Sequence, residues 1–460
     1  MDNLLNHELQ NKRIQDAIKK SIEAYFPIET KNRRLEISNV YIKDNLDSND
    51  FPSQKDAKLN RRSWQTPIHA DIKLINTETG KIVNQKKNIK IGSLPKLTNR
   101  FTTIVDGNEY QTVNQLRRKP GIYSRVKKNG ELESEFNLAK GLNFKMMLDP
   151  VSEVFYIVMA NRKYRLWTLL QTIGVTDVEM EKIWGSKLLL KNKKGALNTE
   201  ESEMTSIYTK VFRKEPNNYD EVVKGLQEYF TDKGTSIDEG TTKLTLGKSF
   251  NAVTGDALLA TAKKLLDINK GETQPDDRDS LIYKDLHTID DLVIDHFKRN
   301  TEVIIEKVKR TMGLRDTVRE IVPAATFTKP VKDFFTVGDL AATPAQTNPA
   351  QIVSDWRKTS PMGTGGIQSR HAITMETRDM QPTHLGFLDP LATPESGRVG
   401  VTVGMASEVQ KGKDGMATPV IDPKTHKMKF ISPLEFYESK IGFPDQYEYK
   451  NKKVKPRYAI

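Results

Sequence analysis

Cysteine is absent from the sequence and histidine is scarce, with seven histidines spread over 460 residues. Without thiols the chain cannot form disulfide bonds, thiolate zinc sites, iron–sulfur clusters or a cysteine nucleophile. The histidines are scattered, and none has a second histidine four residues away on the same helical face. We therefore expect this chain to bind no metal ion through soft ligands.

Long apolar runs are also missing from the sequence. No stretch reaches the roughly 18 apolar residues that a membrane-spanning helix requires. The first residues mix acids, bases and amides where a signal peptide would have an apolar core. We expect a soluble, cytoplasmic protein that has no membrane partner.

The positive charge is spread along the chain. Lys and Arg total 72 against 60 Asp and Glu, which gives a formal net charge of +12. A basic surface favours a polyanionic partner such as nucleic acid. A lysine-rich surface that only keeps the protein in solution explains the same charge equally well.

The length of 460 residues predicts about three domains, at roughly 150 residues each, and the patterns favour a multidomain α+β fold. Residues 1–140 combine a first helix, which stops at Pro27, with strand-like segments such as the alternating stretch 68–75. The pairs Asp106-Gly107 and Asn129-Gly130 predict hairpin turns. The apolar residues near the helical period of the first helix are Leu5, Leu9, Ile18, Ile22 and Tyr25.

Residues 141–289 carry mainly helical patterns, including a capping box at Thr176 and Glu179 whose helix should end at Gly185. A further amphipathic helix begins at 289, and we expect about 290–340 to complete the first domain. After Pro323 the chain is rich in Pro, Thr and Gly, which predicts a loop-rich region over 341–460.

Two short motifs give only weak functional signals. The sequence "LGKS" at 246–249 lacks the first glycine of a phosphate-binding loop, because Thr242 stands there, so we interpret it as a turn. The run "PDDRDS" at 275–280 holds three aspartates that could bind Mg²⁺. Such clusters more often solvate a loop or cap the following helix.

The glycine-rich stretch "SPMGTGGIQSRHA" at 360–372 is flanked by cations. Arg357 and Lys358 precede it, and Arg370 and His371 end it. Glycines let a backbone approach a ligand closely, and cations contact phosphate. An ordinary flexible loop would show the same composition.

Longer motifs resemble one family. The stretch "QTNPAQIVSDWRKTSPMGTGGIQSRHA", followed by "RDMQPTHLG" and "TPESGRVG", resembles the fork region of the beta subunit of multisubunit DNA-dependent RNA polymerases. Residues 91–123 are similar to the protrusion of that subunit, "DDRDSL" to a lobe motif, and "KPVKDFF" to the approach to the fork. The resemblance implies a protrusion-like domain at 1–140, a lobe-like domain at 141–289 and a fork-like region at 341–460.

The resemblance also implies a function. The assembled enzyme would transfer nucleotides onto RNA with Mg²⁺ bound by a beta-prime-like subunit, so this chain would contain neither catalytic residues nor a metal site and would be inactive alone. The family pattern continues past Ile460, which suggests an N-terminal half of a split beta subunit, as in giant bacteriophages. The implied partners are the C-terminal half, beta-prime-like subunits, a phage promoter-specificity factor, template DNA and transcript RNA. The implied location is the cytoplasm of the infected host, or the virion.

The residues to which the resemblance assigns nucleic-acid contacts are Arg357, Lys358, Arg370, Arg378, Glu395 and Arg398. Pro382, Pro390 and Pro394 would brace the loops, whereas His384 fits a buried hydrogen-bonding residue equally well.

Rifamycin antibiotics bind bacterial members of the family beside the fork. Gln115 and Ser360 match the usual residue types of that pocket. The family would have Gln, Asp, His and Arg at four further positions, which here are Ala342, Ala345, Asp355 and Lys358. We expect these departures to weaken rifamycin binding by several kcal/mol, so that the assembled enzyme is resistant.

Two alternatives remain open from the sequence. The same basic loops would serve a stand-alone nucleic-acid-binding protein without polymerase activity. The aspartates of 275–280 would serve an unrelated metal-dependent hydrolase.

Overall fold

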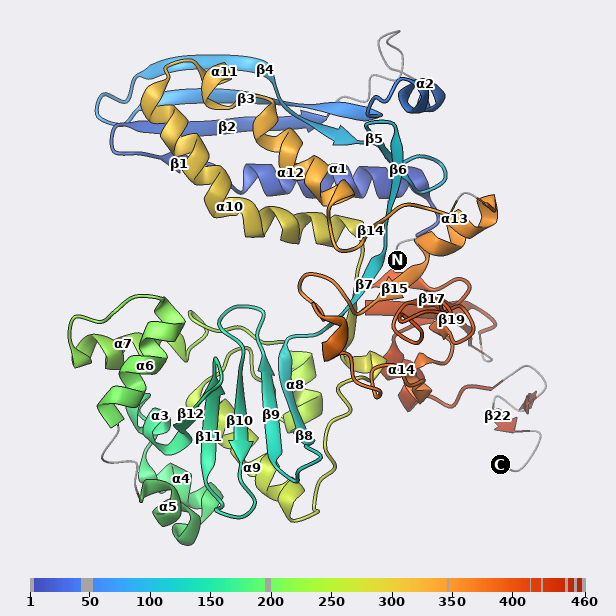
Figure 1. Ribbon diagram of the computed structural model, residues 1–460. Helices are drawn as coiled ribbons and strands as arrows, with labels where there is room; N and C mark the ends of the chain where they lie inside the picture. The colour runs from blue at the N-terminus through green and yellow to red at the C-terminus, as the bar shows by residue number, and fades with distance from the viewer. Residues whose placement is uncertain are drawn as a thin grey trace. The chain divides into compact units, whose positions relative to one another are not determined.

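The computed structural model describes residues 4–42, 53–194, 200–345, 347–413, 415–422, 425–442, 446–450 and 453–456. It confirms a multidomain α+β fold with several sheets (Figure 1). The chain forms two compact units, one of Met1–Arg117 with Lys284–Ile460 and one of Arg118–Tyr283. Among the residues described, no helix has both the length and the apolar character to cross a bilayer.

This division differs from the expected boundaries at 140 and 289. The hairpin at Asn129-Gly130 forms as predicted, but its strands β8 (Gly121–Val126) and β9 (Leu132–Asn137) pair onward with β10 (Phe144–Leu148). These strands therefore belong to the second unit. The region 341–460 joins the first unit because β15 (Lys358–Ser360) pairs with β7 (Asn114–Arg118).

The first unit contains an antiparallel sheet in the order β1-β2-β3-β4. Its strands are β1 (Ile28–Glu29), β2 (Arg33–Ile42), β3 (Gln65–Asn76) and β4 (Ile82–Pro95). The alternation predicted for 68–75 is confirmed, since every second side chain of β3 from Ile68 to Leu74 is fully buried. One face of the sheet thus enters the core, as alternation along a strand requires.

Helices cover that buried face (Figure 1). They are α1 (His7–Glu23), α10 (Ile289–Leu314), α11 (Val318–Ile321) and α12 (Ala325–Thr336). Ile18 and Ile22 of α1 are buried as predicted, but Leu5 is 46% exposed because it precedes the helix, whose N-cap is Asn6. Residues of α10 and α12 belong to the same core as this sheet.

A second part of the first unit is built on the five-stranded sheet β13-β7-β15-β17-β16. Besides β7 and β15, it contains β13 (Lys284–His287), β16 (Leu388–Asp389) and β17 (Val403–Met405). Strands β7 and β15 are parallel, whereas β15 and β17 are antiparallel. The remaining elements of the first unit are α2 (Gln54–Leu59), β5 (Thr103–Val105), β6 (Asn108–Thr112), β14 (Ala341–Ala342), α13 (Pro349–Trp356), η2 (Arg370–Ala372), η3 (Pro382–His384), β18 (Gln410–Gly412), β19 (Gly415–Ile421), β20 (Met428–Ile431), α14 (Pro433–Glu438), β21 (Tyr447–Lys450) and β22 (Lys453–Pro456).

The loop-rich expectation after Pro323 is only partly correct. Helix α12 forms even though Pro330 lies inside it, because Phe327, Val331 and Phe334 recur at helical spacing and are buried. The prediction missed this helix because it relied on the Pro, Thr and Gly content after Pro323 and not on the spacing of the apolar residues. The region from 361 to 402 does consist mainly of turns and short 3-10 helices, as expected.

The second unit has a sheet in the order β12-β11-β10-β9-β8, with β11 (Phe155–Met159) and β12 (Arg162–Arg165) next to β10. Its helices are α3 (Leu166–Thr172), α4 (Asp177–Trp184), α5 (Ser186–Lys193), α6 (Glu200–Phe212), α7 (Tyr219–Tyr229), α8 (Glu239–Leu246) and α9 (Gly255–Asn269), and the 3-10 helix η1 (Leu281–Tyr283) follows. The capping box of Thr176 and Glu179 and the end of α4 at Gly185 are confirmed. The "LGKS" motif is a turn, in which Gly247 ends α8 with a φ of 72°.

Candidate nucleic-acid interface

The glycine loop, residues 361–367, follows β15 and wraps around side chains of β7. Gln115 is fully buried, and its Nε2 donates to the carbonyl of Met362 at 2.8 Å and to that of Thr364 at 3.4 Å. Gly363 and Gly365 have φ values of 100° and 90°, which residues with a side chain rarely adopt. The loop is therefore bonded to a buried side chain of β7 and favours glycine at two of its positions.

Arg117 connects this loop to helix α10. Its Nη2 and Nε donate to Oε1 of Gln115 at 2.7 and 3.2 Å, and its Nη1 donates to Oδ2 of Asp295 at 2.5 Å. A Cβ atom on Gly365 would lie 2.7 Å from the guanidinium group, so a side chain at this position would force Arg117 to shift. The sequence analysis missed Arg117 and Asp295, because no local pattern joins a strand residue to a helix residue 178 positions away.

Two of the cations expected to contact nucleic acid are engaged within the protein. Nη2 of Arg357 donates to the carbonyls of Ala406 and Ser407, and burial lowers the pKa of Arg357. Nζ of Lys358 lies 2.6 Å from Oδ1 of Asp355. These interactions give Arg357 and Lys358 structural roles, which the sequence did not predict.

Of two other cations expected to contact nucleic acid, Arg378 has a described side chain and Arg370 does not. Arg378 also bonds within the chain, donating to the carbonyls of Gly397 and Val399. The side chain of Arg370 lies outside the described residues, although its backbone begins η2.

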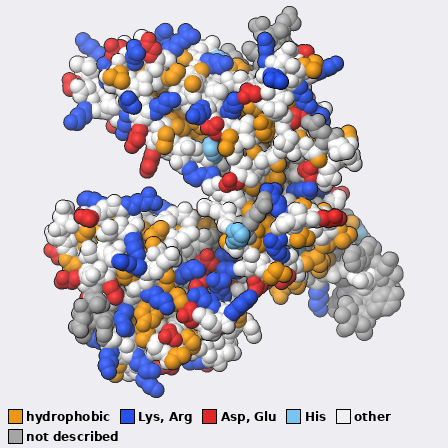
Figure 2. Space-filling model, in the orientation of Figure 1, with side chains coloured by type: hydrophobic (Ala, Val, Ile, Leu, Met, Phe, Trp, Pro, Cys, Tyr) orange, Lys and Arg blue, Asp and Glu red, His pale blue; other side chains and the backbone are white. Residues whose placement is uncertain are grey.

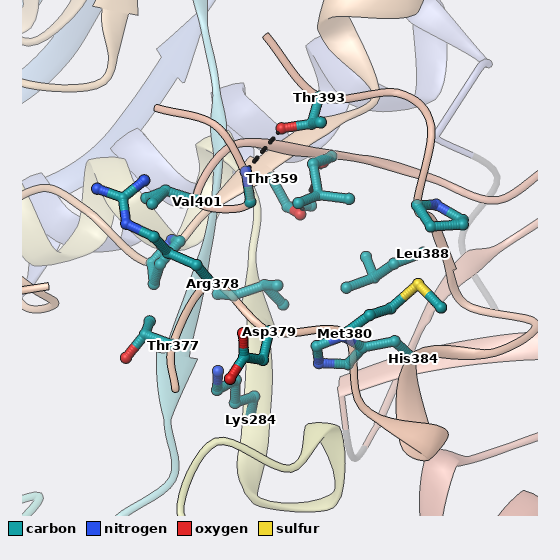
Figure 3. Close-up of a pocket in the computed structure, with 15 residues that line it drawn as sticks. Lys284, Thr359, Thr377, Arg378, Asp379, Met380, His384, Leu388, Thr393 and Val401 are labelled. Atoms are coloured by element: carbon teal, nitrogen blue, oxygen red, sulfur yellow. Dashed lines mark hydrogen bonds between the residues drawn. The ribbon is translucent and has the colours of Figure 1, made fainter. Parts of the chain in front are cut away.

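Glu395 and Arg398 are exposed on the turn 393–400. The main-chain N–H of Gly400 closes this turn by donating to Oγ1 of Thr393 at 2.9 Å, the dashed line in Figure 3. Of the six residues predicted to bind nucleic acid, these two are the ones that the structure places on the surface without an assigned internal role.

A small cavity lies beside this turn within the first unit (Figure 3). Arg378, Thr377 and Val401 line one side, and Met380, His384 and Leu388 line the other. Nδ1 of His384 accepts a hydrogen bond from the N–H of Gln381 at 3.3 Å, but the side chain is half-buried and not fully buried. Pro382 begins η3, and Pro390 lines the cavity.

The structure brings together some of the positions that were predicted to correspond to a rifamycin pocket. Ser360 and Gln115 are direct partners across the parallel pair β15 and β7, and Asp355 is ion-paired with Lys358. Ala342 lies on β14 opposite Gln111, and Ala345 is exposed in the loop that follows. Because the Gln115 amide is buried and already bonded to the glycine loop, it differs from a ligand-facing glutamine.

A basic sheet face in the second unit was not predicted from the sequence. Glu133 of β9 is surrounded by Arg125, Lys127 and Lys145 at 2.7, 3.0 and 3.1 Å. Burial alone would raise the pKa of Glu133, but hydrogen bonds from the three cations lower it to about 2. Because one carboxylate faces three cations, the surface around Glu133 keeps an excess of positive charge.

The register of the strands extends this face. Phe136, Met146 and Ile157 point into the helix-covered core, so the neighbouring residues of each strand point the other way. The outward residues and those that flank them are Arg118, Arg125, Lys127, Glu133, Glu135, Lys145, Tyr156, Lys163, Arg165 and Arg278. Figure 2 shows several Lys and Arg side chains on this unit.

Tyr156 adds an aromatic ring to the basic sheet face. Nζ of Lys163 and the guanidinium carbon of Arg165 lie 5.8 and 5.9 Å from its ring centroid. Cations next to a partly exposed aromatic ring are the combination that proteins use to hold single-stranded nucleic acid.

The aspartates of 275–280 have structural partners. Both carboxylate oxygens of Asp276 accept from Nζ of Lys264 at 2.7 and 2.6 Å, and one also accepts from the N–H of Ser124 at 2.7 Å. Burial raises the pKa of Asp276 and lowers that of Lys264. Within the described ranges, no group of three or more His, Cys, Asp or Glu side chains is arranged to hold a metal ion.

Comparisons with known proteins agree with the resemblance. Residues 343–410 match the family described as RNA polymerase Rpb2, domain 3. A DNA-directed RNA polymerase subunit beta of Prochlorococcus marinus (strain AS9601) is 26% identical over 400 residues, which cover 81% of this chain and 36% of that protein. The subunit beta of Nostoc sp. (strain PCC 7120) is 25% identical over 450 residues, which cover 92% of this chain and 39% of that protein.

The chain thus spans less than two-fifths of the length of these relatives. The matched family domain contains the glycine loop and the turn 393–400. Together, the family match and the relatives support a protein similar to the beta subunit of multisubunit RNA polymerases.

Proposed function

We propose that this chain forms part of a beta-like subunit in a multisubunit DNA-dependent RNA polymerase, where it holds template DNA and the RNA–DNA hybrid. The observation that carries the proposal is the glycine loop. It lies within the segment that matches the polymerase family domain, and Gln115 and Arg117 fix its shape from inside.

A fixed loop suits this role because a polymerase must keep template and transcript in register. Glycines without side chains allow the backbone to approach phosphates and bases closely. Glu395 and Arg398 on the neighbouring exposed turn provide charged side chains for contact. In this proposal Arg357 and Arg378, which bond carbonyls of the chain, shape the surface, and the exposed Arg398 binds nucleic acid.

The basic sheet face supports the same role through a separate feature. Its cations neutralise phosphates, and Tyr156 offers a ring on which an unpaired base can stack. We infer that this face holds a single strand.

The remaining parts of the proposal rest on the resemblance alone. The assembled enzyme would carry out nucleotidyl transfer, with Mg²⁺ held by a beta-prime-like partner. A split beta subunit, a phage promoter-specificity factor as partner, and a location in the infected host or the virion stay predictions.

Co-expression with neighbouring polymerase-like genes, followed by purification and a transcription assay, tests the proposal. We expect stable co-purification with large partner chains and RNA synthesis by the complex but not by this chain alone. A monodisperse monomer that binds DNA in a salt-sensitive way and ignores those partners would instead support the stand-alone nucleic-acid-binding protein. Metal-dependent hydrolysis by the lone chain would support the third alternative.

The rifamycin prediction is tested in the same purified assay. With alanines at 342 and 345 and an ion pair at Asp355 and Lys358, we propose that the complex transcribes at rifampicin concentrations that silence a bacterial host polymerase. Inhibition at concentrations like those for the host would show that these positions do not correspond to the pocket.

A further inference from the structure

Hydrogen bonds from the side chain of Arg378 hold the turn 393–400. Nη1 and Nη2 of Arg378 each lie 3.2 Å from the carbonyl oxygen of Gly397, and Nη1 lies 2.6 Å from that of Val399. A guanidinium group can reach both carbonyls because its N–H donors lie in one rigid plane. The two carbonyls belong to the residues before and after Arg398 in the sequence. Arg378 therefore bonds the backbone next to Arg398 on both sides.

The backbone of Arg378 also packs against the end of this turn. Gly400 has a φ of 70°, and a Cβ atom there would lie 2.6 Å from the carbonyl oxygen of Arg378. The hydrogen bond from the Gly400 N–H to Thr393 closes the other side at 2.9 Å. The turn is therefore held by contacts at both ends and by the bonds of Arg378 to Gly397 and Val399. Glu395 and Arg398 of this turn are exposed.

We propose that Arg378 is a positioning residue that sets the place of Arg398 on the nucleic-acid surface and makes no phosphate contact of its own. This role rests on the proposed function, in which the turn faces nucleic acid. It assigns the two arginines of one small region to different tasks, although both carry the same charge. The guanidinium group of Arg378 donates to carbonyls of the chain, whereas the side chain of Arg398 is exposed to solvent.

Salt dependence distinguishes the two roles. The purified complex of this chain with its polymerase partners is titrated with a short fluorescent RNA–DNA hybrid at several salt concentrations. Each lost phosphate contact lowers the slope of log affinity against log salt by about 1. We expect Arg398→Ala to lower the slope by about 1, and Arg378→Ala to lower it by the same amount or less because it displaces Arg398.

The variant that combines Arg378→Ala with Arg398→Ala distinguishes a positioning role from a second phosphate contact. If Arg378 acts through Arg398, the double variant has the slope of Arg398→Ala alone. A slope lowered by about 2 would mean two independent phosphate contacts and would overturn the positioning role. Arg310→Ala is the matched control, because Arg310 is exposed on α10, away from this turn in sequence, and we expect it to leave the slope unchanged.

Arg378→Lys separates charge from geometry. Lysine keeps the positive charge but cannot present a planar pair of donors to two carbonyls. We expect this variant to bind the hybrid as weakly as Arg378→Ala and to exchange the Gly400 amide hydrogen faster than the wild type. Wild-type binding and exchange in Arg378→Lys would contradict the role.

The proposed function fails separately from this inference. A wild-type complex that does not bind the hybrid would overturn both, whereas a complex that binds it with additive slopes would overturn only the role of Arg378.

Discussion

The side-chain amide of Gln115 donates to the main-chain carbonyl of Met362 across 247 residues of sequence, at a distance of 2.8 Å. This bond and the parallel pairing of β7 with β15 build the glycine loop onto a strand from a distant part of the chain. The shape of the loop therefore depends on side chains that do not belong to it.

Replacing Gln115 with leucine should release the loop. The variant keeps the volume but removes the donor to Met362 and Thr364 and the acceptor for Arg117. We expect a loss of about 1–3 kcal/mol in the free energy of unfolding, the usual cost of buried polar groups that lose their partner. Denaturant unfolding measures it, with the exposed Gln85→Leu as control. Equal stability of both variants would contradict this account of the loop.

Gly366→Ala should disturb the same loop by a different mechanism. A Cβ atom at this position would lie 2.3 Å from the carbonyl oxygen of Pro361, so the backbone has to move. We expect a destabilisation of about 1–3 kcal/mol, typical of overpacking. Gly397→Ala is the control, because a Cβ atom there meets nothing within 4 Å. If both substitutions are neutral in thermal unfolding, the close approach at Gly366 is not a constraint.

Arg357→Ala should affect stability more than nucleic-acid binding. The variant leaves the carbonyls of Ala406 and Ser407 without the guanidinium donor. Hydrogen bonds to charged groups contribute about 1.5–3 kcal/mol, and we expect a loss in this range. The salt slope for the hybrid should stay as in the wild type. A slope lowered by about 1 at unchanged stability would restore Arg357 as a phosphate contact.

The second unit should lose stability in acid through Glu133. The pKa of this group is lowered from 4.5 to about 2 by Arg125, Lys127 and Lys145, against the opposing effect of burial. A carboxylate whose pKa is lower in the folded state stabilises the protein above its unfolded pKa, and the stabilisation is lost as the pH falls toward the folded value. We expect a loss on the order of 2 kcal/mol between about pH 4.5 and 2.

Hydrogen exchange of the β8–β10 amides across this pH range measures the effect. Glu133→Gln should be less stable at neutral pH and nearly independent of pH over the same interval. Glu272→Gln, at an exposed position, is the control and should retain the acid loss. An unchanged acid loss in Glu133→Gln would assign it to other carboxylates.

Local patterns predicted the local structure well. The alternation of β3, the Asp106-Gly107 hairpin with φ values of 49° and 84°, and the capping box of α4 each depend on residues close in sequence. The exposure of Leu5 shows the limit of a periodic pattern, which does not specify where a helix begins. The motif resemblance and the family match fall on the same part of the chain, because the longest motifs quoted from the sequence lie mainly within residues 343–410.

The roles of individual cations could not be predicted. Arg357, Arg378 and Arg398 carry the same charge in similar sequence surroundings, yet two of them bond backbone carbonyls and one is exposed. That difference arises from segments up to 50 residues away that fold against them. The basic sheet face was missed for the same reason, since its cations come from several strands and meet only through the register of the sheet.

The parallel pairing of Asn114 with Thr359 also determines when each unit can fold during synthesis on the ribosome. Residues 118–283 are continuous, and their strands pair with close neighbours, so this unit can fold as soon as its last helix has emerged. Strand β7 has to wait for β15 and β17 to be translated before its five-stranded sheet is complete. The first unit begins synthesis earlier but finishes folding later, and its apolar surfaces are exposed to chaperones and to aggregation during that interval.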